Sequence, residues 1–140
     1  MCFFKKKTVA KRRKEIERTI SPMQIVMAYN VFRSSLESTN QRLALDGGAF
    51  DCYGASLMLP IIAYYMPNLL LTNCIVDTNS QKTGLSYINF DREIINETLY
   101  NYNDANLIIT AISTKMATRK IIKKLIALNV RNIILPFNTI

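Results

Sequence analysis

The sequence predicts an α/β fold in which a mostly parallel sheet carries helices on both faces. The first observation is that short apolar runs of strand length alternate with segments of helical periodicity along most of the chain. The second is the length of 140 residues, which suits one domain with one core. The third is a hydrophobic content of 49%, which is typical of a folded protein rather than a disordered one.

The elements are expected in the following order. Residues 1–21 form a basic tail or exposed helix that Pro22 closes, and residues 22–140 form the domain. Strands are predicted over residues 24–28, 42–45, 69–76, 106–112 and 132–135. Helices are predicted over residues 31–39, 56–66, 90–102 and 118–129, the third of them capped by Asn89.

The composition excludes several classes of catalytic and metal-binding site. The chain has no histidine, so imidazole acid–base catalysis and histidine-ligated metals are excluded, and no metal or cofactor is expected. Its three cysteines are odd in number and form no CxxC pair, which indicates a reducing compartment and a cytoplasmic protein. The 25 residues from Cys52 to Val76 carry no charge, yet Pro60 and Pro67 interrupt them, so no membrane span is expected.

Charge is unevenly spread along the chain. Residues 1–20 hold eight Lys/Arg against two acids, and residues 115–140 hold six Lys/Arg and no acid. Nucleic acid, an acidic lipid surface and an acidic protein are all open as partners for these basic ends. The candidates for neutralising nucleic-acid phosphates are Lys5, Lys6, Lys7, Lys11, Arg12, Arg13 and Lys14.

Candidate ligand groups follow the predicted strands, because ligands of parallel sheets bind beyond the carboxyl ends of the strands. Gly47 and Gly48 follow one predicted strand and could offer bare backbone to an anion, although such pairs are often simple turns. Residues 113–115, "STK", offer two hydroxyls and an ammonium, and Asp77 opens a polar loop. A solvated loop is the alternative in each case.

The order of these features resembles the C-terminal effector domain of DeoR-type transcriptional regulators. The resemblance is carried by "QIVMAYNVFRSSLE", "LALDGGAFDCYGASLMLPIIA", "TGLSYINFDREIINETL" and "ANLIITAISTK", and covers roughly residues 22–135. It implies the fold of ribose-5-phosphate isomerase and CoA transferases, and a domain that binds a phosphorylated sugar or related metabolite. By position, it nominates Asn30, Gly47, Gly48, Asp77, Gly84 and Lys115 as effector-binding residues.

The chain also departs from the family pattern. The winged helix-turn-helix and the Asp-x-Gly-Thr-Thr phosphate loop are not found, and Tyr29 and Val31 replace small hydroxyl residues beside Asn30. We therefore expect a truncated, degenerate sensor domain that is not an enzyme and does not itself bind DNA sequence-specifically. It would act by association, with itself or with a full-length DeoR-type regulator, and bind sugar phosphates weakly or not at all.

Two alternatives remain open from the sequence. One is a sugar-phosphate isomerase-like enzyme of the same fold, with Asp46, Asp77 and Lys115 as acid–base groups. The other is a nucleic-acid-binding accessory protein that uses the basic N-terminus.

Overall fold

The computed structural model describes residues 20–47, 49–111 and 114–137. The chain falls into two units, Met1–Val31 and Phe32–Ile140. The described part of the first unit, residues 20–31, is the start of helix α2 (Pro22–Asp46). The second unit holds the rest of α2 and all the strands that the structure describes.

Five parallel strands form one sheet, as the sequence predicts. The strands are β1 (Asp51–Tyr53), β2 (Ile75–Asp77), β3 (Ile94–Asn96), β4 (Asn106–Ile109) and β5 (Asn132–Ile134). They lie in the order β3-β2-β1-β4-β5. From the central β1 the chain runs outward through β2 to β3, and then returns to the other side of β1 to form β4 and β5. Parallel neighbours need crossover connections, and helices and short 3₁₀ turns supply them.

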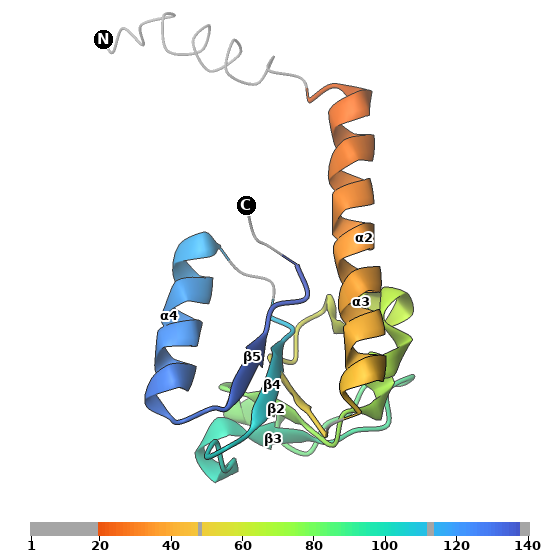
Figure 1. Cartoon of the computed structure of the whole chain (residues 1–140). Helices are drawn as coiled ribbons and strands as arrows, with labels where there is room; N and C mark the ends of the chain where they lie inside the picture. Colours follow the sequence, from red (N-terminus) through yellow and green to blue (C-terminus); the bar gives the residue numbers. More distant parts are fainter. Residues whose placement is uncertain (1–19, 48, 112–113, 138–140) are drawn as a thin grey trace, which may run out of the picture. The chain divides into compact units, whose positions relative to one another are not determined.

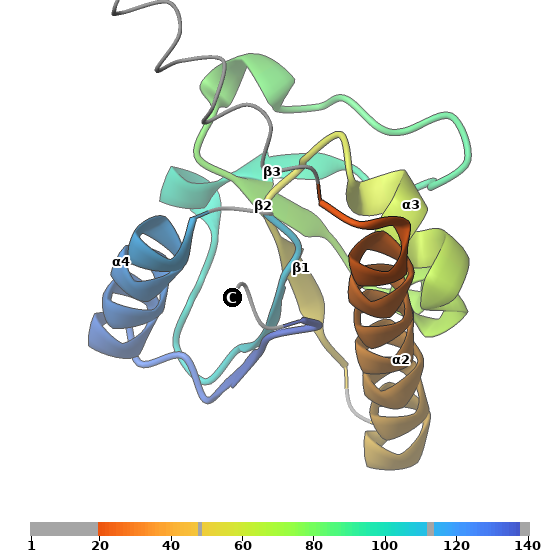
Figure 2. The same cartoon turned by 90° about the horizontal axis from the view of Figure 1, so that it is seen from above.

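The two crossover helices cover opposite faces of the sheet (Figure 1). Helix α3 (Leu59–Tyr65) and the 3₁₀ turn η1 (Pro67–Leu71) join β1 to β2, and helix α4 (Lys115–Ala127) joins β4 to β5. Figure 2 shows α4 on one side of the sheet and α3 on the other. Right-handed crossovers require this placement, because the two connections run outward from β1 and β4 in opposite directions.

Each face has its own hydrophobic core. The face under α3 and the later part of α2 buries Leu36, Leu59 and Ile62, with exposed fractions of 0%. The face under α4 buries Leu107 and Leu125, also at 0%. A sheet buried on both faces explains why the strands are almost uniformly apolar.

The expected strands at 24–28 and 42–45 are wrong, because both lie within α2. Ser21 and Gln24 form a reciprocal cap at its start: the Gln24 amide N–H donates to Ser21 Oγ at 3.2 Å, and the Ser21 N–H donates to Gln24 Oε1 at 2.8 Å. Pro22 occupies the first turn, where its missing N–H costs nothing. Pro22 therefore opens a helix, and the predicted helix over residues 31–39 is confirmed as part of it. The segment that Pro22 was expected to close lies almost entirely outside the described residues.

The expected helix over residues 90–102 is also wrong. Ile94 pairs with Ile75 of β2, and residues 94–96 form the edge strand β3. Asn96 then caps the short 3₁₀ turn η3 (Glu97–Leu99) by accepting from the Thr98 N–H at 3.0 Å. β-branched Ile94 and Ile95 suit this strand, so pairing overrides the helical spacing.

The remaining elements are confirmed with shifted ends. Helix α3 begins three residues late, α4 begins three residues early, and β4 and β5 are shorter than expected. The strand expected at 69–76 is reduced to β2, because η1, which Pro67 begins, takes up the first three residues of that run. The polar loop after β2 contains the 3₁₀ turn η2 (Ser80–Lys82). Among the described residues, no helix is long and apolar enough to cross a membrane, and the uncharged run 52–76 is divided between these short elements.

Candidate functional site

The carboxyl ends of β1 and β4 lie side by side at the point where the sheet connections diverge. Ligands of open parallel sheets bind at this point. Gly54 follows β1 directly, with a φ of +108°, and a Cβ at this position would lie 2.4 Å from the Cβ of Ala111. The crossover therefore requires glycine here.

Side chains from two neighbouring segments hold the loop of residues 54–56. The hydroxyl of Thr110, just after β4, donates to the carbonyl of Gly54 at 2.7 Å. The hydroxyl of Ser56 donates to the carbonyl of Thr110 at 3.1 Å, and that of Tyr87 donates to the carbonyl of Ser56 at 2.8 Å. These bonds fix the loop before any ligand arrives, which lowers the entropic cost of binding.

Asp77, one of the nominated residues, lies at the carboxyl end of β2 and is 8% exposed. Its Oδ2 accepts from the amide N–H of Ala55 at 2.7 Å and from Lys82 Nζ at 3.3 Å, and its Oδ1 accepts from the N–H of Asn79 at 2.8 Å. Lys82 also donates to the carbonyl of Ala55 at 2.8 Å. A buried carboxylate needs this pairing, so Asp77 ties the β1 loop to the β2 loop and positions Lys82.

A cavity of about 270 Å³ opens beside this network. Ser56, Lys82, Ser86 and Tyr87 supply its polar wall, and Leu57, Leu85 and Ile94 are among its apolar lining. An ammonium has three donors, and the carbonyl of Ala55 and the carboxylate of Asp77 accept two of those of Lys82. The cavity thus combines one cation with several hydroxyls, the set that suits a small, hydroxylated anion.

Burial raises the pKa of the Tyr87 hydroxyl from 10.0 to about 12, and the nearby Asp77 carboxylate adds to the rise. Tyr87 therefore stays protonated at neutral pH and remains a donor to the loop.

Burial likewise raises the pKa of the Cys52 thiol from 9.0 to about 12. Cys52 is fully buried in β1, and raised pKa values make both it and Cys74 poor nucleophiles at neutral pH.

These raised pKa values predict a loss of stability in alkali. The unfolded chain loses the Cys52 proton near pH 9, while the folded chain keeps it until about pH 12. The stability is thus fully present below pH 9 and falls as the pH rises toward the folded pKa, by at most about 1.4 kcal/mol per pH unit for this group. Urea unfolding at a series of pH values measures the decline. Cys52→Ala should flatten the curve above pH 9, and an unchanged slope would contradict this assignment.

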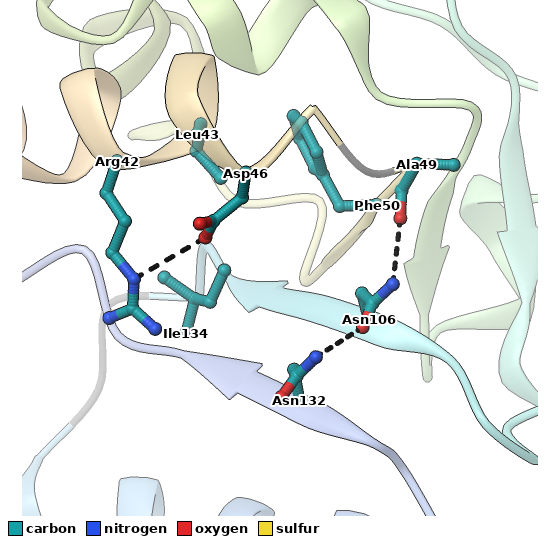
Figure 3. A pocket seen from close by; sticks show the side chains of 8 residues that line it. All are labelled: Arg42, Leu43, Asp46, Ala49, Phe50, Asn106, Asn132 and Ile134. Carbon is teal, nitrogen blue, oxygen red and sulfur yellow. Dashed lines mark hydrogen bonds and ion pairs between the residues drawn. The ribbon is translucent and has the colours of Figure 1, made fainter.

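A second pocket, of about 320 Å³, lies at the opposite end of the strands (Figure 3). We call this end of the sheet, where the strands begin, the amino edge, and the end beside Lys82, where they finish, the carboxyl edge. Arg42 and Asp46 contribute from the end of α2, and Asn106 and Asn132 from the first residues of β4 and β5. Asn132 Nδ2 donates to Asn106 Oδ1 at 2.7 Å, and Asn106 Nδ2 donates to the carbonyl of Ala49 at 3.1 Å. This pocket adjoins the Gly47 turn and is the alternative ligand site.

Electrostatics favours the carboxyl edge over this pocket for an anion. Helix α2 ends here on Asp46 with no basic residue in its last turn, so the negative end of its dipole meets the pocket. The Arg42 guanidinium is 3.7 Å from the Asp46 carboxylate, and both side chains are largely exposed. A phosphate would face a carboxylate and helix carbonyls in this position.

The structure does not bring the nominated effector residues together. Asp77 and Lys115 follow strands at the carboxyl edge, whereas Gly47 ends α2 at the amino edge. Gly84 donates its N–H to the carbonyl of Ile94 beside β3. Asn30 lies on the exposed part of α2 in the first unit. Gly48, like the seven candidate cations between Lys5 and Lys14, lies outside the described residues.

The proposed acid–base trio is likewise divided. Asp46 lies at the amino edge, and Asp77 and Lys115 at the carboxyl edge, so the three groups cannot meet one substrate. Within the described part of the chain, no group of three His, Cys, Asp or Glu side chains is placed to hold a metal ion.

A separate polar cluster lies on the α4 face. Lys124 forms an ion pair with Glu97, and the hydroxyl of Tyr53 donates to Glu97 Oε2 at 3.3 Å. Lys124 Nζ also donates to the Tyr53 hydroxyl at 3.4 Å. Neither the cavity beside Lys82 nor the pocket beside Gly47 includes these side chains in its walls. The cluster therefore ties α4 to β1 and η3 rather than facing a substrate.

The chain was compared with protein families, curated proteins and solved structures. No family model, curated protein or solved structure was found to match the chain.

Proposed function

We propose that the chain is a non-catalytic sensor domain that binds a phosphorylated sugar at the carboxyl edge of β1 and β2. The observation that carries this proposal is the 270 Å³ cavity, whose lining includes Lys82, Ser56, Ser86 and Tyr87. The resemblance to DeoR-type effector domains supports the same ligand class. It also supports a regulatory output through association with another copy or with a full-length regulator.

The dimensions of the site suit a small ligand. Pockets for drug-sized molecules hold roughly 300–1,000 Å³, so a cavity of about 270 Å³ fits a monosaccharide phosphate better than a larger cofactor. Lys82 would pair with the phosphate, and the serine hydroxyls would contact sugar hydroxyls. Asp77, whose described partners already occupy both oxygens, holds Lys82 in place and does not contact the ligand.

The affinity is expected to be modest. One lysine supplies the charge, and Asp77 at 3.3 Å offsets part of it. A single charge-assisted hydrogen bond contributes roughly 1.5–3 kcal/mol, so dissociation constants near the millimolar range are expected.

Ser86→Leu tests the proposal. Ser86 is exposed, lines the cavity and forms no side-chain hydrogen bond with the residues that the structure describes, so leucine should fill the space without disturbing the fold. Calorimetric titration with ribose 5-phosphate, fructose 6-phosphate and glucose 6-phosphate should show binding of at least one to the wild type and a loss of roughly tenfold or more in the variant.

Ser38→Leu is the matched control, because Ser38 is exposed on α2 and lines no cavity described above. It should bind as the wild type does. Absence of binding by the wild type at millimolar concentrations, or equal binding by Ser86→Leu, would overturn the proposal.

A further inference from the structure

We infer that the exposed face of α4 binds the phosphate backbone of a nucleic acid. This surface, the α4 basic face, consists of Lys115, Arg119, Lys120 and Lys123. The four side chains line one hollow of about 460 Å³ together with Met116. The inference goes beyond the sensor function, since it concerns a different face of the molecule and does not depend on the sugar-phosphate site.

The charge of this face is uncompensated. No Asp or Glu occurs after Asp104, so α4 itself contains no carboxylate. Two further cations of this part of the chain are paired: Lys124 with Glu97, and Arg131 with Asp104 at 3.9 Å. Among the residues that the structure describes, none of the four cations of the α4 basic face has an ion pair. Such a concentration of one sign of charge attracts a polyanion.

The spacing suits a linear array of phosphates. Lys115, Arg119 and Lys123 recur every four residues and therefore lie about 6 Å apart along the helix. Phosphates of one DNA strand are about 3.4 Å apart along the duplex axis, so long, flexible side chains on one helix can reach several of them. Lys120 widens the same face toward a second row of phosphates.

The buried side of α4 favours a nucleic acid over a lipid surface as the partner of the basic face. Leu125 is fully buried and Thr118 is 8% exposed, with Ile121 and Ile122 packed against the same core. A helix that binds in a membrane interface inserts its apolar face into the lipid, but in α4 that face packs against the sheet. The contact that remains is electrostatic, which is how proteins bind nucleic-acid backbones.

The recognition is expected to be independent of sequence. Besides Arg or Lys contacts to guanine, bases are read by Asn, Gln and carboxylate side chains or by aromatic stacking. Helix α4 has no Asn, Gln, acidic or aromatic residue, and three of the four cations of its basic face are lysines. The face therefore positions phosphates without distinguishing bases.

The salt dependence of binding to a mixed-sequence DNA duplex of about 20 base pairs tests the inference. Each neutralised phosphate contributes about −0.9 to the slope of log K against log salt concentration. The double substitution Arg119→Gln and Lys123→Gln should therefore reduce the magnitude of the slope by about 1.8 relative to the wild type, whatever other segments contribute. Fluorescence anisotropy between about 50 and 200 mM salt gives both slopes.

The matched control is Arg33→Gln with Arg42→Gln, which changes the net charge equally but removes cations paired with Glu37 and Asp46. It should leave the slope within about 0.5 of the wild-type value. An Arg119→Gln/Lys123→Gln variant that melts like the wild type yet keeps its slope would overturn the inference. So would a wild type that binds vesicles containing phosphatidylserine but not the duplex. Neither result depends on sugar-phosphate binding.

Discussion

Gly54→Ala is expected to destabilise the domain by about 3–5 kcal/mol. The added Cβ would lie 2.4 Å from the Cβ of Ala111, and 2.8 and 2.9 Å from its amide nitrogen and Cα. The opposing atoms are mostly backbone of a neighbouring segment, so they cannot rotate away, and the φ of +108° is strained for any residue with a Cβ. Overpacking and backbone strain each cost roughly 1–3 kcal/mol. Urea unfolding gives the free-energy difference, and near-UV circular dichroism shows whether the variant still packs its tyrosines.

Gly47→Ala is the control for this prediction. A Cβ at Gly47 meets no atom within 4 Å, although its φ of +54° is left-handed. Only the conformational cost of roughly 1–2 kcal/mol is expected, since left-handed backbone is unfavourable for alanine. Equal losses at the two glycines would mean that the β1–β4 crossover is not packed as described.

Leu36→Ala is expected to cost about 2–5 kcal/mol, because the side chain is fully buried and its removal leaves a cavity in the core. Leu36 lies in the part of α2 that belongs to the second unit and shares a hydrophobic cluster with the strands. The loss would show that this part of α2 packs into the core beside the sheet. Chemical unfolding in urea is the measurement.

Leu45→Ala makes the same chemical change on the same helix at a side chain that is 86% exposed. Its effect should stay within about 0.5 kcal/mol. If the two leucines behaved alike, the placement of α2 against the sheet would be wrong in this region.

The elements that sequence predicted well are those with two agreeing signals. The run at 106–112 is apolar and β-branched, and the segment after it combines an apolar stripe at Ile121, Ile122 and Leu125 with lysines on its other faces. Local preference and burial point to the same structure there, so β4, α4 and β5 appear where they were expected.

The full length of helix α2 was not predicted, because its local signals conflict. The run "QIVMA" has strand-like composition, and the following residues look like a short helix and a second strand. The Ser21–Gln24 cap and the i,i+4 ion pair of Arg33 with Glu37, at 2.6 Å, mark one continuous helix instead. Those two signals were readable in the sequence.

The site was misplaced for a related reason. The pair Gly47–Gly48 was expected to follow a strand and face a ligand, but the strand comes after it, as β1. The glycine at the carboxyl edge is Gly54, and only the approach of Ala111, which is 57 residues away in sequence, distinguishes it from a loop glycine. Lys82, Ser86 and Tyr87 had no sequence signal, since their role depends on how the β2–β3 connection folds back over the β1 loop.

Three of the four stretches of the DeoR resemblance, at residues 24–37, 43–63 and 83–99, therefore have different secondary structure from the one assumed for them. The sensor proposal consequently depends on the cavity beside Lys82 rather than on the glycine pair.

An amide-resolved NMR titration with ribose 5-phosphate tests the central claim most directly. Binding at the cavity beside Lys82 should give chemical-shift changes confined to the carboxyl edge, at Ala55, Ser56, Ser86 and Tyr87, with none at Gly47 or Asn106 of the amino edge. Shifts centred on Gly47 and Asn106, or none at any residue with this ligand or the other two sugar phosphates, would contradict it.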